Sequence, residues 1–188
     1  EHLSTEDQLH FKKLVYLIWG VFDPILRPVD SPPVGIQFLD PIQQPIKKSP
    51  YRVSQPKLDF LKTQLREWIE EGIIKPAVSS PWGFPVVIVP KPGINQWRLC
   101  VDLRSLNEVL KHDSFNTPRC DDALNWIVGK RFRSILDVRW GYHNLSLDLF
   151  AQEVLTFLTP LGAISYLRLP FGLATAGGLF QRYMNRCL

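Results

Sequence analysis

Apolar residues recur at helical spacing in several segments of the chain. The clearest stripe lies within residues 56–71, where Pro56 suits the first turn of a helix and Gly72 suits its stop. Ser4 and Asp7 form a capping-box-like pair ahead of another apolar segment, which predicts a helix near the start of the chain. Two further helices are predicted at residues 121–128 and 174–188.

Short apolar runs bounded by proline and glycine predict strands between these helices. The runs at residues 84–89 and 97–101 flank a loop that contains proline and glycine, which indicates a hairpin. Runs at 155–159 and 163–169 predict a second hairpin, and a single run at 132–136 predicts a strand that leads into an aspartate. Since helices and strands are mixed without strict alternation, the pattern favours an α+β fold.

A proline-rich segment separates the first helix from the second. Its eight prolines, between residues 24 and 56, exclude helix there. We expect an extended connector that lies over another surface of the protein.

Composition narrows the class of protein less than the pattern does. The chain has 188 residues, 45% of them hydrophobic, which is enough to bury a sizeable core. Its net charge of +4 and its pI near 9.0 favour an anionic partner only weakly. No apolar run near the N-terminus is long enough to cross a bilayer, so we expect no membrane insertion.

The three cysteines bear on the compartment. None forms a C-x-x-C pair, so we expect reduced thiols and an intracellular, reducing location. The nucleus, the cytoplasm and an organelle all satisfy this expectation. The start at Glu1 indicates a processed or truncated N-terminus, which keeps an organelle among the candidates.

Six segments, in order along the chain, resemble the polymerase region of Ty3/gypsy-type LTR retrotransposons and related reverse transcriptases. They are residues 50–54 (PYRVS), 71–76 (EGIIKP), 79–87 (SSPWGFPVV), 97–107 (WRLCVDLRSLN), 136–143 (LDVRWGYH) and 170–173 (PFGL), the last followed by Phe180-Gln181 and Met184-Asn185. The resemblance covers almost the whole chain.

This resemblance implies a reverse-transcriptase fingers region and a partial palm, with mixed or antiparallel sheets and packed helices. We predict an N-terminal helix and proline-rich connector at residues 1–55 and a fingers-like subdomain at 56–117. Residues 118–188 are then a partial palm that carries the first catalytic motif and the helix after it.

The resemblance also implies nucleotidyl transfer assisted by two Mg²⁺ ions, which prefer hard oxygen ligands such as carboxylates at strand ends. Asp137 matches the catalytic, metal-binding aspartate of the first motif, and the backbone carbonyl of Val138 would lie beside it. Without the resemblance, the better interpretation of Asp137 is an aspartate that caps a turn after a strand.

Three other residues match nucleotide-binding positions of the family. Tyr142 matches the aromatic residue that screens the sugar 2′ position, and alone it would be an ordinary core tyrosine. Lys91 and Arg98 match basic residues that hold the triphosphate, since arginine forks onto phosphate and lysine acts as a point charge. The alternative for both is a solvated basic surface.

The remaining candidates lie in or beside turns. Gly172 matches a glycine where the backbone lies against the nucleotide, and Gln181 would lie near the template on the following helix. A strand-to-helix turn and a surface glutamine are the alternatives. Asp102 and Arg104 are candidates for nucleic-acid contact, or they form an ion pair with each other.

Several positions depart from the family's pattern. The second carboxylate motif, an aromatic-x-Asp-Asp hairpin, is expected after the final helix, and the sequence ends at Leu188. Because one aspartate cannot hold two metal ions, we expect the role of Asp137 to be ancestral and no Mg²⁺ to be bound here. Trp140 replaces a small residue, Gly177-Gly178 replaces a helix-starting proline and its neighbour, and Leu155 replaces a basic residue.

Two hypotheses from different classes remain. The favoured one is a domesticated retrotransposon module without catalytic activity, which serves as a structural or RNA-contacting subunit of a larger ribonucleoprotein assembly with protein partners. The alternative is a fragment of an active RNA-directed DNA polymerase, completed by further sequence or by another chain. RNA or an RNA/DNA hybrid is a candidate partner under both.

Overall fold

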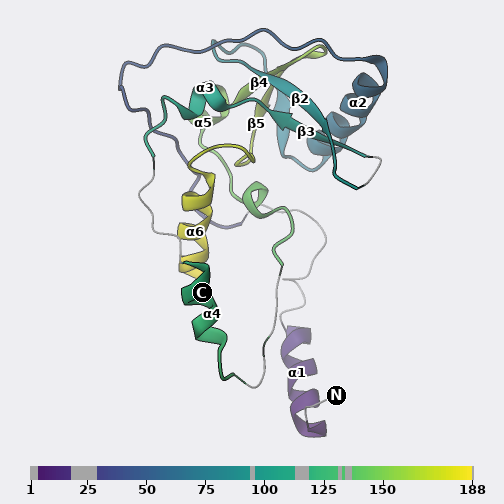
Figure 1. The fold of residues 1–188 in the computed structure, drawn as a ribbon, viewed down its shortest axis with the longest axis vertical. Coiled ribbons are helices and arrows are strands. Elements are labelled where there is room, and N and C mark those ends of the chain that lie inside the picture. The colour runs from purple at the N-terminus through teal and green to yellow at the C-terminus, as the bar shows by residue number, and fades with distance from the viewer. Residues whose placement is uncertain are drawn as a thin grey trace.

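A single five-stranded sheet, with strand order β1-β5-β4-β2-β3, forms the centre of the fold (Figure 1). A computed structural model describes residues 4–17, 29–93, 96–112, 119–130, 133 and 137–187. The strands are β1 (Ile74–Pro76), β2 (Phe84–Pro90), β3 (Trp97–Val101), β4 (Thr156–Thr159) and β5 (Gly162–Tyr166). The helical elements are α1 (Thr5–Leu17), α2 (Gln55–Glu70), α3 (Arg104–Asn107), α4 (Cys120–Ile127), η2 (Gly141–Asn144, a 3-10 turn), α5 (Leu149–Val154) and α6 (Ala176–Cys187). The predicted α+β class is confirmed.

Both predicted hairpins form, and a parallel pairing joins them. β2 pairs antiparallel with β3, and β4 pairs antiparallel with β5. β2 also pairs parallel with β4, which places Phe84 opposite Phe157, and both side chains are fully buried. Strands from the predicted fingers and from the predicted partial palm therefore share one sheet, while the predicted subdomain boundaries stay predictions.

The other predicted elements agree closely with the structure, except at some ends. The α6 helix begins at Ala176, and β5 ends at Tyr166, beyond which Arg168 pairs with Ser146 in an isolated bridge. The Ser4 hydroxyl accepts from the Asp7 amide at 3.1 Å and donates to its carboxylate at 2.6 Å, which confirms the predicted cap. The strand predicted at 132–136 lies, apart from residue 133, outside the described residues.

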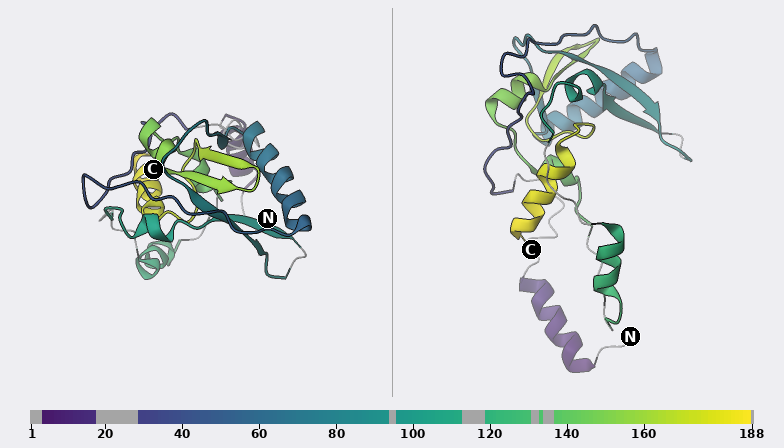
Figure 2. Two further views of the ribbon diagram at one scale, coloured as in Figure 1. Left: turned by 90° about the horizontal axis from the view of Figure 1, so that it is seen from above. Right: turned by 60° about the vertical axis from the view of Figure 1, so that its left-hand side comes forward.

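The α2 helix packs against the sheet through the apolar stripe that predicted it. Leu61, Leu65 and Trp68, spaced by four and three residues, are all buried. The ring of Trp68 lies 6.2 Å from that of Tyr166 in β5. Figure 2 shows α2 running along the sheet, well away from α6.

The proline-rich connector is extended over its described part, as predicted, and crosses the rest of the fold. Isolated bridges join Val34 to Leu147, Phe38 to Leu110 and Lys47 to Gly83. The ring of Phe38 also stacks on Trp82 at 5.2 Å. The connector is thus a wall of the fold and not a free linker.

The α1 and α4 helices lie at the end of the molecule opposite the sheet (Figure 1). Both expose apolar side chains, including Phe11 at 54% on α1 and Trp126 at 69% on α4. No helix of the described chain is long and apolar enough to cross a membrane.

Gly83 lies where the connector meets the sheet, and we expect Gly83→Ala to destabilise the protein. A Cβ at this position would lie 2.7 Å from Leu158 Cδ1 and 3.2 Å from Lys47 Cγ. Overpacking of this kind costs about 1–3 kcal/mol. Urea unfolding followed by circular dichroism measures it, and an unchanged midpoint would contradict the tight packing.

In contrast, we expect Gly177→Ala, in the first turn of α6, to stabilise the protein. A Cβ there would lie 3.8 Å from Tyr142 Oη, an ordinary contact. Since alanine favours helix over glycine by up to about 1 kcal/mol, the variant should be more stable than the natural sequence. The same urea measurement tests it, and destabilisation would show that the helix start needs glycine.

Candidate functional site

Lys91 and Arg98, the predicted triphosphate-binding pair, lie on the β2–β3 hairpin. Arg98 is exposed and pairs with Val89 across the ladder. The Lys91 amide donates to the Gln96 carbonyl at 2.8 Å, which continues this register beyond β2. Residues two apart on one strand share a face, so Lys91 and Arg98 project from the same face of the hairpin. The structure therefore brings these two cations together at a surface that can meet phosphate.

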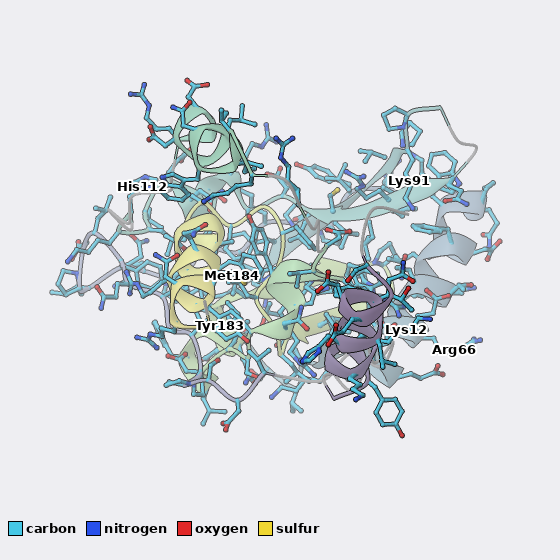
Figure 3. All side chains as sticks on the ribbon, turned by 90° about the horizontal axis from the view of Figure 1, so that it is seen from below. Lys12, Arg66, Lys91, His112, Tyr183 and Met184 are labelled. Atoms are coloured by element: carbon cyan, nitrogen blue, oxygen red, sulfur yellow. The ribbon has the colours of Figure 1, made fainter. Side chains whose placement is uncertain are left out.

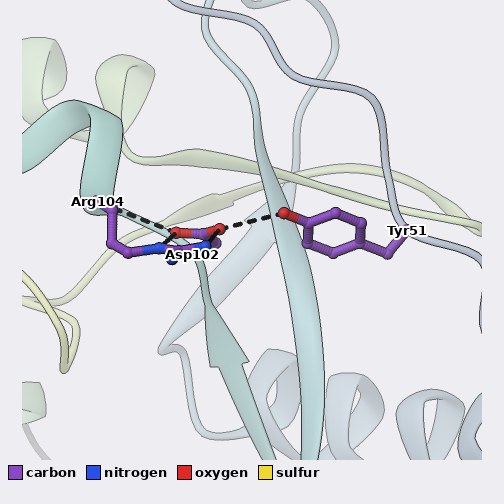
Figure 4. A network of polar contacts seen from close by, with 3 residues as sticks. All are labelled: Tyr51, Asp102 and Arg104. Carbon is purple, nitrogen blue, oxygen red and sulfur yellow. Dashed lines mark hydrogen bonds and ion pairs between the residues drawn. The ribbon is translucent and has the colours of Figure 1, made fainter.

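Asp102 and Arg104 form an ion pair, as one of the two interpretations predicted (Figure 4). Arg104 donates from Nε to Asp102 Oδ1 at 2.8 Å and from Nη2 to Oδ2 at 2.7 Å. The Arg104 amide also donates to Oδ1 at 3.3 Å, and Tyr51 from the connector donates from its hydroxyl to Oδ2 at 3.2 Å. These bonds, above all those from Arg104, hold the pKa of Asp102 well below its ordinary value against the opposing effect of burial. The Arg104 side chain is 82% exposed, so a cation remains at the surface.

The turn at Gly172 is held by Asn107 of α3. Gly172 has φ +88°, a conformation that favours glycine, and a Cβ there would lie 3.9 Å from the Val101 carbonyl. Asn107 Nδ2 donates to the Gly172 carbonyl at 2.9 Å, and the Ala174 amide donates to Asn107 Oδ1 at 2.9 Å. Sequence reasoning assigned Asn107 no role. Its position at the end of the 97–107 motif was the only signal.

Tyr142 lies beside this turn, in an aromatic cluster at the start of α6. Its ring lies 5.0 Å from Phe171 and 5.5 Å from Phe180. Gln181 is the next residue on α6 and donates to Asn185 Oδ1 at 2.8 Å. Tyr142 and Gly172 therefore lie near the start of α6, whereas Gln181 lies in the middle of that helix. Lys91 lies elsewhere, on the hairpin, away from the α6 residues Tyr183 and Met184 (Figure 3).

Asp137 and Val138, the predicted metal ligands, lie at the surface just before η2. Asp137 is exposed, and Val138 is 45% exposed. The Val138 carbonyl accepts a hydrogen bond from the Gly141 amide at 3.3 Å. The intervening Trp140 has φ +59°, which is unusual for a bulky residue.

Sequence comparison identifies relatives that agree with this arrangement. A family model described as "Reverse transcriptase (RNA-dependent DNA polymerase)" matches residues 89–188, more than half of the chain. The chain is 33% identical over 147 residues to the retrovirus-related Pol polyprotein from transposon 412 of Drosophila melanogaster, covering 76% of this chain and 12% of that protein. It is also 33% identical over 152 residues to the Pol polyprotein from transposon opus of Drosophila melanogaster, covering 78% and 15% respectively.

The chain belongs to the reverse transcriptase family. Its relatives place it with the reverse transcriptase domains of LTR retrotransposons, as the sequence motifs predicted. The match spans 12% of the transposon 412 polyprotein and 15% of the transposon opus polyprotein, which is about an eighth and a seventh of their lengths.

Solved structures confirm the reverse transcriptase fold. The prototype foamy virus protease-reverse transcriptase matches 98% of this chain with a TM-score of 0.79 at 18% identity, over 25% of its own length. A foamy viral protease-reverse transcriptase in complex with an RNA/DNA hybrid matches with a TM-score of 0.75 at 15% identity, covering 98% of this chain and 25% of that one.

Reverse transcriptases use Mg²⁺, and this domain's described residues fit one part of such a site. The exposed Asp137 carboxylate is a hard oxygen donor of the kind Mg²⁺ prefers. Within the described ranges, no three His, Cys, Asp or Glu residues lie close enough together to hold a metal ion. The metal roles of Asp137 and Val138 therefore stay predictions.

A buried histidine lies within the segment that resembles the family's first catalytic motif. His143 is 1% exposed. Its ring stacks on Trp140 at 5.7 Å and meets Phe171 edge-on at 5.1 Å. Burial, with a smaller contribution from the charge of Arg168, lowers the pKa of His143 to about 4. Its Nδ1 has no hydrogen-bond partner among the described residues.

We expect this reverse transcriptase domain to lose stability as the pH falls from about 6.5 towards 4. The pKa of His143 is lower in the folded state than its value of about 6.5 in an unfolded chain. Below pH 6.5 the unfolded state therefore binds more protons, and the loss reaches about 3 kcal/mol near pH 4.

Urea unfolding between pH 7 and pH 4 measures this loss. His143→Phe keeps a ring in the aromatic cluster and should flatten the pH dependence. His10→Gln, which removes an exposed imidazole on α1, is the matched control and should leave the pH dependence unchanged. Equal slopes for His143→Phe and the natural sequence would show that another group titrates.

Proposed function

We propose that this chain is the nucleotide- and template-binding part of an RNA-directed DNA polymerase. The observation that carries the proposal is the arrangement of Tyr142, Gly172 and Phe180 around the start of α6. The backbone turn at Gly172 is exposed, and the Asn107 side chain holds it with two hydrogen bonds, one to Gly172 and one from Ala174. A rigid aromatic ring beside an exposed glycine turn suits the close packing of a sugar and base.

The hairpin supports the same proposal. Lys91 and Arg98 share one face of the hairpin, and Arg104, the first residue of α3, adds a third cation with an exposed side chain. Surface cations of this kind bind the phosphates of a nucleic-acid strand. A structural neighbour was solved in complex with an RNA/DNA hybrid, and we propose such a hybrid as the partner of this chain.

We further propose that the chain as given does not polymerise by itself. Two-metal nucleotidyl transfer requires carboxylates that converge from more than one segment. Asp137 would supply one of them, and a second segment, from further sequence or from another chain, would supply the rest.

Binding to an RNA/DNA hybrid tests the first part of the proposal. Lys91→Gln combined with Arg98→Gln should weaken binding and reduce the slope of log K against log salt by roughly 1–2, because about two phosphate contacts are lost. Fluorescence anisotropy across a salt series measures it. The control is Lys62→Gln on α2, which removes an exposed cation that already pairs with Asp59 at 3.6 Å. Equal effects of the double variant and the control would reject the hairpin as the binding surface.

Primer extension tests the second part. We expect no incorporation of deoxynucleotides by this chain in Mg²⁺, although the hybrid is bound. Magnesium-dependent extension that disappears in Asp137→Ala would show that the chain already contains a complete catalytic site.

A second candidate function is a non-catalytic subunit of a larger ribonucleoprotein assembly. Trp126, 69% exposed on α4, and Phe11, 54% exposed on α1, favour it because exposed aromatic residues are enriched at protein interfaces. Trp140 in place of a small residue, and Gly177-Gly178 at the helix start, are departures at positions near the proposed nucleotide. Both features suit a domesticated module whose fold is kept while catalysis is not.

The transcript downstream of Leu188 separates the two candidates. An in-frame aromatic-x-Asp-Asp hairpin would support the polymerase. A stop codon, together with stable protein partners that copurify from the native source, would support the subunit in an intracellular assembly.

A further inference from the structure

A cavity of about 630 Å³ lies between the connector and α6. One wall is the connector segment 31–37, and the opposite wall is one face of α6. Cavities of this size hold small molecules such as a single nucleotide. The cavity is not part of the surface proposed above, which lies on other elements or on another face of α6.

This cavity and the Tyr142 cluster lie on different faces of α6. The cavity is lined by positions 175, 179, 182, 183 and 186, which recur at helical spacing and so share one face. Gly177 and Phe180 lie on the side that faces Tyr142. Figure 3 shows His112 beside α6, whereas Lys91 lies on the hairpin at the other side of the molecule.

The connector wall is held in place before any ligand arrives. The Val34 amide donates to the Ser146 carbonyl at 2.7 Å, and the Asp148 amide donates to the Val34 carbonyl at 3.0 Å. On its other edge, the Lys111 amide donates to the Gln37 carbonyl at 2.8 Å. A Cβ at Gly35 would lie 2.5 Å from Asp148 Oδ2, so a larger residue in this wall would displace that carboxylate. A preformed wall lowers the entropic cost of binding.

The charge of the cavity favours an anion. Lys111, Arg182 and Arg186 line it together with His112, and all four side chains are exposed at its rim. Asp148 is the one carboxylate among the lining residues, and its Oδ1 already caps α5 by accepting from the Ala151 amide at 2.7 Å. Arginine and lysine at a shared rim are the groups that hold phosphate in proteins.

A buried hydroxyl also points to a ligand. Thr175 lines the cavity and is 9% exposed. Its Oγ1 is buried and has no hydrogen-bond partner among the described residues. A buried hydroxyl without a partner is unfavourable, so a hydrogen bond to a polar ligand atom in the cavity would be favourable.

The rest of the lining suits the other end of such a ligand. Leu145 is buried, Leu179 is half-buried, and the ring of Tyr183 lies on the same wall. An apolar wall with an aromatic ring accepts a planar base, while the cations accept its phosphate.

We propose that this cavity binds a nucleoside phosphate, either free or as one nucleotide of a strand. The phosphate would lie at Lys111 and Arg186, the Thr175 hydroxyl would bond to a polar atom of the ligand, and the base would lie against Tyr183. The site is a second nucleotide-binding site on the reverse transcriptase domain, on the face of α6 turned away from Tyr142.

Isothermal titration calorimetry in EDTA tests the proposal on the whole chain, because chelation removes any contribution from divalent metal ions. The probes are adenosine monophosphate, adenosine without phosphate, and a single-stranded DNA of about 12 nucleotides. Adenosine monophosphate should bind saturably, and adenosine should bind at least about tenfold more weakly, since the charge-assisted bonds are lost.

Variants on separate elements then locate the site. Arg186→Gln and Lys111→Gln should each weaken binding by about tenfold or more, and Thr175→Val should weaken it by less. Arg66→Gln, which removes an exposed arginine on α2, is the matched control and should bind like the natural sequence. Thermal melts verify that each variant is folded. Because Arg186 and Lys111 lie on different parts of the chain, one variant still tests the site if the other unfolds.

The probes also distinguish the source of the nucleotide. Binding of adenosine monophosphate shows a free ligand, and Arg186-dependent binding of the DNA alone shows a nucleotide carried by a strand; both outcomes support the site. Saturable binding of neither probe, equal binding of adenosine, or unchanged binding in both rim variants would overturn it. If Lys91→Gln with Arg98→Gln abolishes binding while Arg186→Gln does not, the ligand lies on the hairpin, and only the function proposed above survives.

Discussion

The parallel pairing of β2 with β4 is the contact on which the rest of the structure depends. Each antiparallel hairpin is local in sequence, but this pairing joins Phe84 to Phe157 across a long excursion of the chain. A two-stranded hairpin alone is marginal in water, whereas a five-stranded sheet with a buried face is stable. The two fully buried phenylalanines lie at the join, and Gly83 lies against Leu158 beside them.

The sheet positions α6, and α6 positions the two proposed binding surfaces. The chain leaves β5, passes through the turn at Gly172, and enters α6 with the turn tied to α3 by Asn107. Because Asn107 makes hydrogen bonds to both ends of the turn, the start of the helix is held against the Tyr142 cluster. The opposite face of the same helix then lies across from the connector and closes the cavity. One rigid helix thus serves two surfaces with different chemistry, one aromatic and one cationic.

The segment between Asp137 and His143 combines backbone strain with tight packing. Trp140 has φ +59°, a conformation that costs a bulky residue of order 1–3 kcal/mol. Its ring stacks on the buried His143, which also meets Trp68 edge-on at 5.7 Å. Arg168 donates to the carbonyls of Gly72 and His143, at 3.0 Å and 3.2 Å, and so joins the end of α2 to η2. The aromatic contacts and these bonds hold the strained residue beside Asp137.

Local patterns in the sequence were enough to predict the α2 stripe, the Ser4 cap and both hairpins, because each depends on residues a few positions apart. For the same reason they offered the Asp102–Arg104 ion pair as one of two interpretations. The family motifs added the reverse transcriptase fold. The pairing of Phe84 with Phe157, the Asn107 bridge, the Tyr51 bond to Asp102 and the cavity between segment 31–37 and α6 were decided only by the tertiary structure. Periodicity records which face of an element is apolar, but it does not record which distant element covers that face, and these contacts join elements far apart in the chain.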